Sequence, residues 1–513
     1  MNAPVILDRF RFDAALATTA RRYELLIDGI WCQATDRGEL TRTSPAHGLT
    51  VSTYARAGAV EVETALATAR RAFDEESWPR WTGAERSRLL LNVASFIERD
   101  AELLATLDVL ESGKPIVQAR AEIAGAVDIW RYAAALARDL HGDSYNALGP
   151  AKLGVVIREP IGVVSIITPW NFPFLIVSQK LPFALAAGCT AIVKPSELTS
   201  ASTLHLGRLL LEAGLPAGVV NILVGTGPEV GAPLTADSRV DMVSFTGSTR
   251  VGKTAMAMAS ATLKKTSMEL GGKNPQIVFP DADLDAALDA VVFGAYFNAG
   301  ECCNAGSRIM LHETIADDFL AAACDRAATV PVGDPLDPVV KVGAVITPAH
   351  LAQIGHHVEA ARSAGAAVML GGARVATPVG HFMAPTIVSR VEPAMAIARE
   401  EIFGPVLSVM TFRTAAEVVA IANDTVYGLS ASVWSRNIDT CFAVSRGVRA
   451  GTVWVNTFMD GAAELPFGGF KQSGVGRELG RNAVADYTEE KTLYFHTGPR
   501  TNWWLPARPN GAA

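Results

Sequence analysis

Hydrophobic and polar residues follow two different periods along this chain, and the change falls near residue 155. Between residues 60 and 140, apolar positions recur at helical spacing in Ala- and Leu-rich segments such as VETALATARRAFDEE and AERSRLLLNVASFIERDAELLATLDVLES. Beyond residue 155, short β-branched and apolar runs alternate with helical patterns. The first part is therefore predicted to be helical, and the remainder to alternate strands with helices.

The short apolar runs predict a parallel sheet in each half of this later region. Runs that are apolar at nearly every position suit strands that helices cover on both faces. The first runs are GVVSIIT, TAIVKPS, VVNILVG, DMVSFTG and NPQIVF, and the alternation resumes with SRIMLH, AVML, LSVMTF, SASVWS and GTVWVN. We therefore expect an α/β fold with two lobes, and the segment FNAGECCNAGSR (297–308) lies near their junction.

Length, composition and charge narrow the class of protein. A chain of 513 residues exceeds one compact core, so about two to four domains are expected. Hydrophobic residues make up 49% and charged residues 19%, which suits a water-soluble protein with a large interior. The net charge of −7, with Lys and Arg scattered, argues against a nucleic-acid partner or an anionic membrane surface.

Neither export nor membrane insertion is predicted. The N-terminal MNAPVILDRFRFDAALATTARR lacks an apolar core and carries Asp8 and Asp13. The most apolar long stretch, FLIVSQKLPFALAAGCTAIV, is interrupted by Lys180 and Pro182, so buried strand and helix are expected there. Six cysteines in a chain of this length do not indicate a disulfide framework. We expect a cytoplasmic protein with reduced thiols and no membrane partner.

Two glycine-rich turns suit phosphate binding, because both place backbone N–H groups at predicted helix N-termini. GSTRVGKT, from Gly247 to Thr254, matches the P-loop pattern between a strand and a helix. GTGPEVG, from Gly225 to Gly231, is one residue longer than the dinucleotide fingerprint. A nucleotide triphosphatase also needs a strand that ends in an acid for magnesium, and the nearest candidate, IVFPD, is interrupted by a proline. A bound dinucleotide is favoured over a triphosphatase and over two ordinary turns.

Cys302 and Cys303 raise the question of whether one of them is a nucleophile. The sequence contains no C-x-x-C or H-E-x-x-H, which argues against a metal site, and a disulfide between neighbours would be strained. Packing and catalysis remain. A catalytic thiolate needs a base and donors for an oxyanion, and TPWNFPF (168–174) and MELGGKNP (268–275) offer Asn171 and Glu269. Taken singly, Asn171 is equally explained as a turn former and Glu269 as a solvated helix end.

Seven motifs, taken together and in order, resemble the NAD(P)-dependent aldehyde dehydrogenase superfamily: TPWNFP, KPSE, FTGSTRVGK, ELGGKNP, NAGECC, EEIFGPV and PFGGFKQSGVGRELG. The resemblance implies that Cys303 is the nucleophile, because it stands three residues after Gly300 in an N-x-G-x-x-C pattern that begins at Asn298. Cys302 is then a bystander. The other cysteines are expected to pack or to lie near the surface: Cys32, Cys189, Cys324 and Cys441.

The resemblance also implies the reaction. The Cys303 thiolate attacks an aldehyde to form a thiohemiacetal, whose oxyanion is held by the Asn171 amide and the Cys303 backbone N–H. Hydride transfer to the nicotinamide leaves a thioester, and Glu269 activates the water that hydrolyses it. This glutamate favours release of a free acid over transfer to coenzyme A. Lys180 and Glu478 match positions linked to proton relay.

For the cofactor, the resemblance implies NAD, with NADP as an alternative. Lys194 and Glu197 would hold the adenosine ribose, where a carboxylate binds ribose hydroxyls and repels a 2′-phosphate. Ser248 would lie beside the pyrophosphate, and Glu401 and Phe403 would hold the nicotinamide ribose and ring. The further cofactor positions implied are Thr168, Pro169, Trp170, Ser196, Gly227, Gly231, Phe245, Gly247 and Leu270.

The family architecture implies two doubly wound parallel-sheet lobes, one of them a Rossmann-like cofactor domain, and a small β oligomerisation element. Residues 1–139 and 160–271 would form the NAD-binding domain, residues 272–483 the catalytic domain, and residues 140–159 and 484–513 the oligomerisation element. A homodimer or homotetramer is expected, and the tryptophans of TNWWLP near the end fit a segment that packs on a partner subunit.

The substrate is expected to be a small-molecule aldehyde whose identity the sequence leaves open. By position, its channel includes Trp170, Phe172, Ile176, Phe458 and Phe467. An aromatic channel suits an apolar aldehyde or, by cation–π attraction, one that bears an ammonium group.

Several charged residues bear on that choice. Asp460 and Glu464 favour an amino- or betaine-type aldehyde if they face the entrance, and are otherwise solvated loop acids. Arg120 is a candidate partner for a semialdehyde carboxylate. Glu301, two residues before the nucleophile, would raise the pKa of Cys303 if its charge faces the thiol.

Three alternatives to an acid-forming dehydrogenase stay open. They are a nucleotide triphosphatase built on GSTRVGKT, a silent member of the fold that only binds NAD, and a coenzyme A-acylating relative. The silent member has no support from the sequence, since Asn171, Glu269 and Cys303 are all present.

Overall fold

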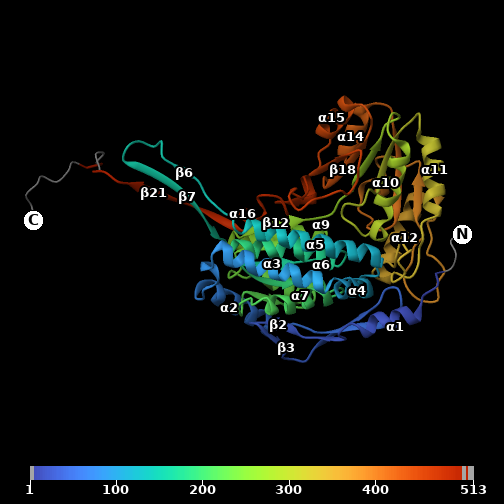
Figure 1. Cartoon of the computed structure of the whole chain (residues 1–513). Coiled ribbons are helices and arrows are strands. Elements are labelled where there is room, and N and C mark those ends of the chain that lie inside the picture. The colour runs from blue at the N-terminus through green and yellow to red at the C-terminus, as the bar shows by residue number, and fades with distance from the viewer. Residues whose placement is uncertain (1–4, 500–503, 506–513) are drawn as a thin grey trace, which may run out of the picture.

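Two α/β lobes and a narrow projecting arm make up the computed structural model, which describes residues 5–499 and 504–505 (Figure 1). Each of the predicted apolar runs contains a strand. The predicted α/β fold with two parallel-rich sheets is confirmed. None of the helices among the described residues combines the length and the apolar character needed to cross a membrane.

The first lobe is built on an eight-stranded sheet. Its strands are β2 (Leu25–Ile27), β3 (Ile30–Cys32), β8 (Val163–Ile167), β9 (Thr190–Lys194), β10 (Val220–Ile222), β11 (Met242–Thr246), β12 (Lys265–Glu269) and β20 (Gly474–Val475). Their order is β20-β12-β11-β8-β9-β10-β2-β3. The strands from β12 to β10 are parallel, so the loops that follow them meet at one edge of the sheet, as in Rossmann-like folds.

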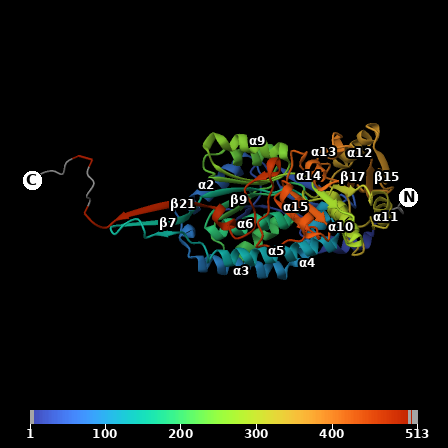
Figure 2. The same cartoon turned by 90° about the horizontal axis from the view of Figure 1, so that it is seen from above.

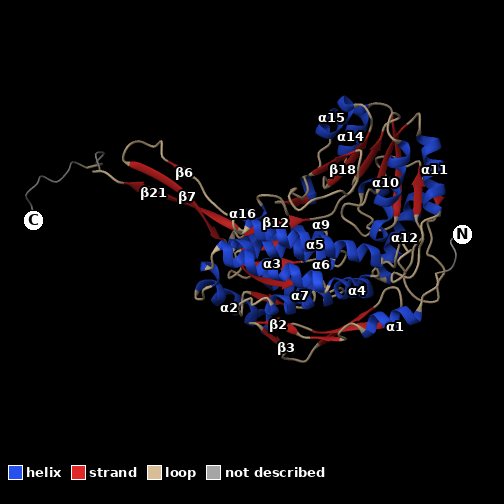
Figure 3. Ribbon diagram, in the orientation of Figure 1, coloured by secondary structure: helices blue, strands red, loops and turns tan. Residues whose placement is uncertain are grey.

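Helices cover this sheet in more than one layer (Figure 3). They are α2 (Ala59–Asp74), α3 (Gly83–Arg99), α4 (Ala101–Ser112), α5 (Ile116–Leu136), α6 (Pro173–Ala187), α7 (Ala201–Glu212), α8 (Ala232–Ala236) and α9 (Thr249–Ala259). Helix α6 packs on β8 and β9, and α5 packs on the outer side of α6. One continuous apolar core results, in which Trp78 and Trp130 are fully buried.

The second lobe has a seven-stranded sheet in the order β15-β16-β17-β14-β13-β18-β19. All its neighbours are parallel except β15 and β16. The strands are β13 (Pro275–Val278), β14 (Arg308–His312), β15 (Ala367–Leu370), β16 (Thr386–Ser389), β17 (Val406–Phe412), β18 (Ser430–Trp434) and β19 (Thr452–Val455). Separate apolar cores lie on its two faces, as expected for strands that are apolar throughout.

Helices pack against both faces of this sheet and complete the two apolar cores. Helices α10 (Leu284–Tyr296) and α11 (Ala316–Ala328) contribute to one core. Helices α12 (Pro348–Ser363), α14 (Ala415–Asn423) and α15 (Ile438–Gly447) contribute to the other, which also includes residues of the short α13 (Ala396–Arg399). The segment 297–308, which carries Cys302 and Cys303, follows α10, and its Asn298 contacts Asn171 in the first lobe.

A long antiparallel arm projects from the first lobe, away from the second (Figure 2). It consists of β6 (Ser144–Tyr145), β7 (Lys152–Pro160) and β21 (Thr488–His496), in the order β21-β7-β6. These strands come from the two segments predicted to form the oligomerisation element. Helix α16 (Ala483–Asp486) leads into β21. Trp503 lies outside the described residues, and Trp504 is 91% exposed on the single chain.

A fourth sheet has three strands, β1 (Arg22–Tyr23), β4 (Glu39–Thr43) and β5 (Thr50–Ala55), and it follows helix α1 (Arg9–Ala17). The boundary predicted at 271/272 lies between β12 of the first sheet and β13 of the second. Strand β20, from within the predicted catalytic segment, pairs with β12 of the first sheet. The division of the chain into domains stays a prediction.

Candidate active site

Cys303 lies in the loop between α10 and β14, and this loop has an unusual backbone. Asn298, Ala299 and Gly300 have φ values of 52°, 54° and 71°. A non-glycine residue in the left-handed region costs on the order of 1–3 kcal/mol and persists only where its surroundings hold it. The loop is therefore expected to be fixed by contacts from several elements.

Two asparagines hold the loop before the nucleophile. The Asn298 side-chain amide donates to the backbone oxygens of Asn171 and Glu301, at 3.0 Å each. The Asn171 side-chain amide donates to the same Glu301 oxygen at 3.1 Å. An amide nitrogen carries two N–H groups, so Asn171 keeps one for a ligand. Asn171 therefore contacts the segment that carries the two cysteines.

Asn274, which the sequence patterns did not single out, holds the loop after the nucleophile. Its amide nitrogen donates to the backbone oxygens of Cys303 at 2.7 Å and Ala305 at 2.9 Å. Its side-chain oxygen accepts from the Ser430 backbone N–H at 3.0 Å. Gly272 lies against the Cys303 carbonyl, where a Cβ would clash. Cys303 therefore has a fixed backbone.

The two neighbouring thiols have different surroundings. Cys302 is buried in a small apolar cluster with Phe172, Ile176 and Ala305, whereas Cys303 is partly exposed. A hydrogen bond with the Cys302 thiol, burial, and the Glu401 carboxylate raise the pKa of Cys303. The Cys303 thiol thus needs a base to become a nucleophile.

Glu269 is the last residue of β12 and is only 4% exposed. Neither oxygen of its carboxyl group has a hydrogen-bond partner among the described residues. Burial and then the Glu478 carboxylate raise the pKa of Glu269 well above its ordinary value, and the Lys180 ammonium opposes them. An unpaired buried carboxyl group is unfavourable for folding and is typical of functional sites. It is not a solvated helix end.

Lys180 and Glu478 form a buried ion pair next to Glu269, with 2.6 Å between Nζ and Oε1. The Lys180 ammonium also donates to Ser244 Oγ at 3.1 Å. The Tyr487 hydroxyl donates to the same Ser244 oxygen at 3.3 Å. These polar groups form a connected path that leads from Glu478 through the interior of the first lobe.

The predicted cofactor residues follow successive strands at the carboxyl edge of the first sheet. Thr168, Pro169 and Trp170 follow β8, while Lys194 is the last residue of β9 and Ser196 and Glu197 follow it. Gly227 and Gly231 follow β10. Phe245 lies in β11, Gly247 and Ser248 follow that strand, and Leu270 follows β12. This edge, where loops from parallel strands meet, is where open α/β sheets bind dinucleotides.

The side chains at this edge fit a dinucleotide. Lys194 Nζ is buried, lies 3.5 Å from the Glu197 carboxylate and donates to the Pro195 carbonyl at 3.0 Å. Burial lowers the pKa of Lys194. Ser248 is the exposed N-cap of α9, at a helix end suited to phosphate. The Thr168 hydroxyl is buried and has no partner within the described part of the chain.

Glu401 and Phe403 approach the same region from the second lobe. Glu401 accepts a hydrogen bond from the Gly272 backbone N–H at 3.0 Å, and burial raises the pKa of Glu401 to about 7. Gly271 leaves the space that this carboxylate occupies. The Phe403 ring meets the Trp170 ring edge-on, with 5.4 Å between centroids. The two lobes thus contribute to one site.

Four of the predicted channel residues lie in different parts of the fold. Phe172 and Ile176 lie together in the apolar cluster that includes Cys302, with Phe297 and Met459 packed against it. Phe458 belongs to the core of the second lobe, where its ring lies 5.1 Å from Trp454. The backbone of Phe467 pairs with that of Glu478 through two hydrogen bonds of 2.7 Å.

The sequence patterns did not predict Phe297 as a channel residue, because it precedes the N-x-G-x-x-C pattern. Its ring stacks on that of Phe172, with 6.1 Å between centroids. An aromatic residue at the start of a strained loop that carries the nucleophile is the signal that identifies it.

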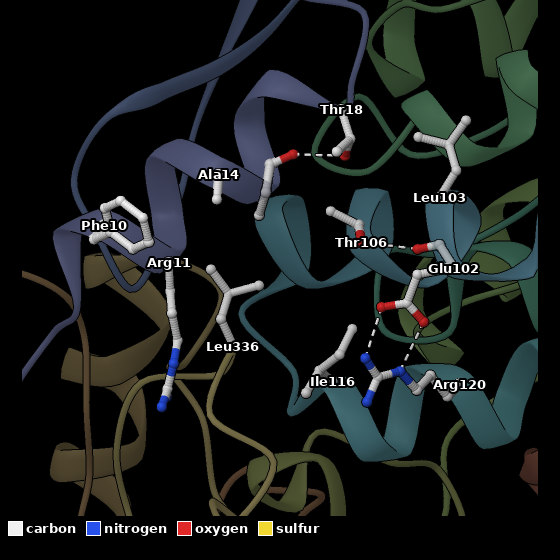
Figure 4. Close-up of a pocket in the computed structure, with 11 residues that line it drawn as sticks. Phe10, Arg11, Ala14, Thr18, Glu102, Leu103, Thr106, Ile116, Arg120 and Leu336 are labelled. Carbon is white, nitrogen blue, oxygen red and sulfur yellow. Dashed lines mark hydrogen bonds and ion pairs between the residues drawn. The ribbon is translucent and has the colours of Figure 1, made fainter.

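The charged residues considered for substrate binding have other partners or lie exposed. Asp460 accepts a hydrogen bond from the Thr457 hydroxyl, and Glu464 is exposed. Arg120 binds Glu102 through two hydrogen bonds of 2.6 and 2.8 Å. It lines a separate pocket of about 540 Å³ between α1, α4 and α5, which shares no residue with the candidate active site (Figure 4).

Glu301 is turned away from the thiol. Its carboxylate accepts from the Ile346 backbone N–H at 3.0 Å and lies 3.8 Å from His350 Nε2. The charge of Glu301 is therefore not what raises the pKa of Cys303.

The P-loop interpretation of GSTRVGKT is wrong. Helix α9 begins at Thr249, so only Gly247 and Ser248 remain as a turn between strand and helix. Lys253 lies one turn into the helix and donates to the Gln472 side chain at 2.8 Å. No phosphate-wrapping loop exists at this position.

Known proteins agree with this geometry. The model of the aldehyde dehydrogenase family matches residues 31–493. Betaine aldehyde dehydrogenase of Bacillus subtilis is 41% identical over 94% of this chain and 99% of its own. Aminoacetaldehyde dehydrogenase of Pseudomonas aeruginosa is 41% identical over 96% of this chain and 99% of its own.

A crystal structure of an NAD-dependent aldehyde dehydrogenase from Sinorhizobium meliloti superimposes with a TM-score of 0.95. It is 48% identical and covers 96% of this chain and 98% of its own. The chain therefore belongs to the aldehyde dehydrogenase family.

Proposed function

We propose that Cys303, Asn171 and Glu269 carry out the NAD-dependent oxidation of an aldehyde to its carboxylic acid. The main support is that contacts and charge effects link these three residues, which come from distant segments of the chain. Asn171 and the cysteine loop share the Glu301 carbonyl as a hydrogen-bond acceptor. The Cys303 charge contributes to the raised pKa of Glu269. A nucleophile, an oxyanion donor and a base are the parts that this chemistry requires.

In the first step, the Cys303 thiol loses its proton to the Glu269 carboxylate, and the sulfur adds to the aldehyde carbon. A C–S bond forms while the C=O π bond becomes an oxyanion. The free N–H of Asn171 and the Cys303 backbone N–H donate to this oxyanion. Glu401 and Phe403 would hold the nicotinamide end of NAD⁺, which when bound would supply the acceptor for the hydride.

Before the second step, Glu269 releases the proton that it took from Cys303. The ionised carboxylate then takes a proton from water as the oxygen adds to the thioester carbon. The carbonyl re-forms, the C–S bond breaks, and the acid leaves with Cys303 as thiolate. Glu269 must then pass its proton on. The adjacent Glu478–Lys180 pair, which continues to Ser244 and Tyr487, is the route that we propose.

For the substrate, we propose an aldehyde that carries an amine or ammonium group. Relatives with about two-fifths of their residues identical act on betaine aldehyde and aminoacetaldehyde, as their names state. The stacked rings of Phe172 and Phe297 beside Cys302 suit a cationic or apolar group.

We also propose that the enzyme is a homodimer or homotetramer that assembles through the arm. Strand β21 lies at the edge of the arm's sheet, and its outer backbone groups have no strand neighbour in the described part of the chain. Such an edge pairs readily with another chain. Tyr494 and Phe495 on this strand are 59% and 46% exposed.

The experiment that tests the nucleophile follows NADH formation with a panel of amino-, betaine-type, aliphatic and carboxy-aldehydes. Cys303→Ala is expected to lose activity by about 10⁴-fold or more, whereas Cys302→Ala turns over like wild type. If Cys303→Ala stays active, the assignment of the nucleophile is wrong. A preference for carboxy-aldehydes would contradict the proposed substrate class only.

A further inference from the structure

Three buried polar residues at the start of α5 have no part in the mechanism above. Lys114, Gln118 and Glu122 are all less than a tenth exposed. Lys114 Nζ lies 2.5 Å from Glu122 Oε2, and Gln118 Nε2 donates to Glu122 Oε1 at 2.8 Å. The Lys114–Gln118–Glu122 cluster thus uses both oxygens of its carboxylate.

This cluster fixes which way the Gln118 amide points. Glu122 is held by Lys114 and accepts only, so the NH₂ group of Gln118 must face it. The Gln118 oxygen is thereby turned towards the cysteine loop. There it accepts a hydrogen bond from the Asn298 backbone N–H at 3.1 Å, across 180 positions in the sequence.

Asn298 is the residue at which the loop enters its left-handed stretch, with φ of 52°. Its side chain holds the backbone of Asn171 and the Glu301 carbonyl. The Glu301 carbonyl in turn orients the Asn171 amide. A shift of Asn298 would therefore move both the oxyanion donor and the nucleophile.

We propose that Gln118 is a positioning residue for the reaction. It touches neither substrate nor cofactor, and acts by holding Asn298 so that Asn171 and Cys303 keep their relative places. This inference rests on the proposed function for its effect on turnover. Its effect on the reactivity of Cys303 does not depend on turnover, so the two are separable.

Four variants test the proposal. Gln118→Leu removes the acceptor at similar size, and Gln118→Asn keeps an amide that is one methylene too short to reach Asn298. The double variant Gln118→Glu/Glu122→Gln exchanges amide and carboxylate, which preserves the buried charge and an acceptor for Asn298. Val117→Ala, at the exposed neighbouring position, is the matched control.

Each variant is measured for kcat and KM, for thermal unfolding, and for the rate at which iodoacetamide alkylates Cys303. Alkylation is measured in the Cys302→Ala background without aldehyde or NAD, and the modified residue is located by mass spectrometry. Gln118→Leu and Gln118→Asn are expected to lower kcat about 10- to 100-fold, since small misplacements of reacting groups have effects of this size. KM is expected to stay within about threefold, and alkylation to slow by at least about tenfold.

The exchange variant is expected to restore both rates to within about fivefold of wild type, whatever its melting temperature. The proposal is overturned if the Leu and Asn variants alkylate and turn over like Val117→Ala while melting earlier, which would mark a structural role only. It is also overturned if the exchange variant is no faster than Gln118→Leu. Should Gln118→Leu fail to fold, Gln118→Asn and the exchange variant decide between these outcomes. If no aldehyde is oxidised by wild type, alkylation alone still tests the positioning.

Discussion

At the scale of single residues, burial does not separate functional acids from structural ones. Glu301 and Glu269 are both almost fully buried, and burial raises the pKa of each. Glu301 accepts from the Ile346 backbone N–H, whereas neither Glu269 oxygen has a partner in the described residues. The absence of a partner, together with the nearby thiol, is what distinguishes a base from a structural carboxyl group.

The pH dependence of turnover is expected to follow Glu269. Because burial and Glu478 raise its pKa, the ionised base is scarce at acidic pH and increases as pH rises, so kcat should rise about tenfold per pH unit below that pKa. Glu269→Gln is expected to lose this limb and about 10²- to 10⁴-fold in kcat. The pH dependence of Cys303 alkylation serves as control, because it should persist in the variant. A kcat limb that survives Glu269→Gln would assign it to another group.

Loss of the oxyanion donor is expected to act on kcat. Asn171→Ala removes one N–H to the oxyanion, and such a loss typically costs on the order of 10²-fold. Steady-state kinetics with the best aldehyde should show this fall in kcat, and the pH optimum of the variant should equal that of wild type. An effect on KM alone would mean that Asn171 binds substrate rather than the oxyanion.

Cofactor choice is expected to depend on Glu197. Its carboxylate lies 3.5 Å from Lys194 Nζ at the end of β9 and would repel a 2′-phosphate. Glu197→Gln should therefore raise kcat/KM for NADP relative to NAD, measured with one aldehyde at fixed concentration. If the ratio of kcat/KM for NADP to that for NAD is unchanged, Glu197 does not contact the adenosine ribose.

At the scale of helices and strands, the hydrophobic pattern predicted the strands whose residues are nearly all apolar. It did not predict strands that contain mainly polar residues. Strand β12, KTSME, has polar residues at four of its five positions, so no apolar run marked it. It nevertheless carries Glu269. The left-handed loop at Asn298 was equally hidden, because its backbone depends on contacts with Asn171 and Gln118 rather than on local preference. The motifs predicted the candidate catalytic residues, whereas the residues that hold them in place could be recognised only in the fold.

Gly468 shows how an element controls a catalytic side chain. Its φ is 150°, and a Cβ there would lie 2.5 Å from Glu269 Oε1. Gly468→Ala is expected to displace the base and to add on the order of 1–3 kcal/mol of backbone strain. Activity and thermal unfolding should both fall. Gly461→Ala, in the same loop with nothing within 4 Å of the added Cβ, is the control and should behave like wild type.

At the scale of the whole molecule, the site is assembled from both lobes and the arm remains outside it (Figure 1). Glu401 and Phe403 come from the second lobe, and Lys194 and Ser248 come from the first. Such an arrangement could be predicted from the order of the motifs, because parallel strands collect their loops at one edge. The sequence could not predict which apolar residues lie beside the cysteines. Phe458 belongs to the core of the second lobe, whereas Phe297 stacks on Phe172 next to Cys302.

Oligomer formation is expected to require the arm. Tyr494→Glu/Phe495→Glu places charge on both exposed faces of β21 and should shift the enzyme to a smaller species in light scattering. Leu263→Glu, at an apolar residue that is 92% exposed and lies outside the arm, should leave the assembly intact. Unchanged mass in the arm variant would contradict this mode of assembly.

The Lys180–Glu478 pair also bears on how the chain folds during its synthesis. Lys180 lies inside the first lobe, yet its counter-ion is made 298 residues later. A buried ammonium that lacks its partner is unfavourable by several kcal/mol. The interior around α6 is therefore expected to reach its full stability only after Glu478 has been synthesised, and a chain truncated before this residue is expected to have a less stable first lobe.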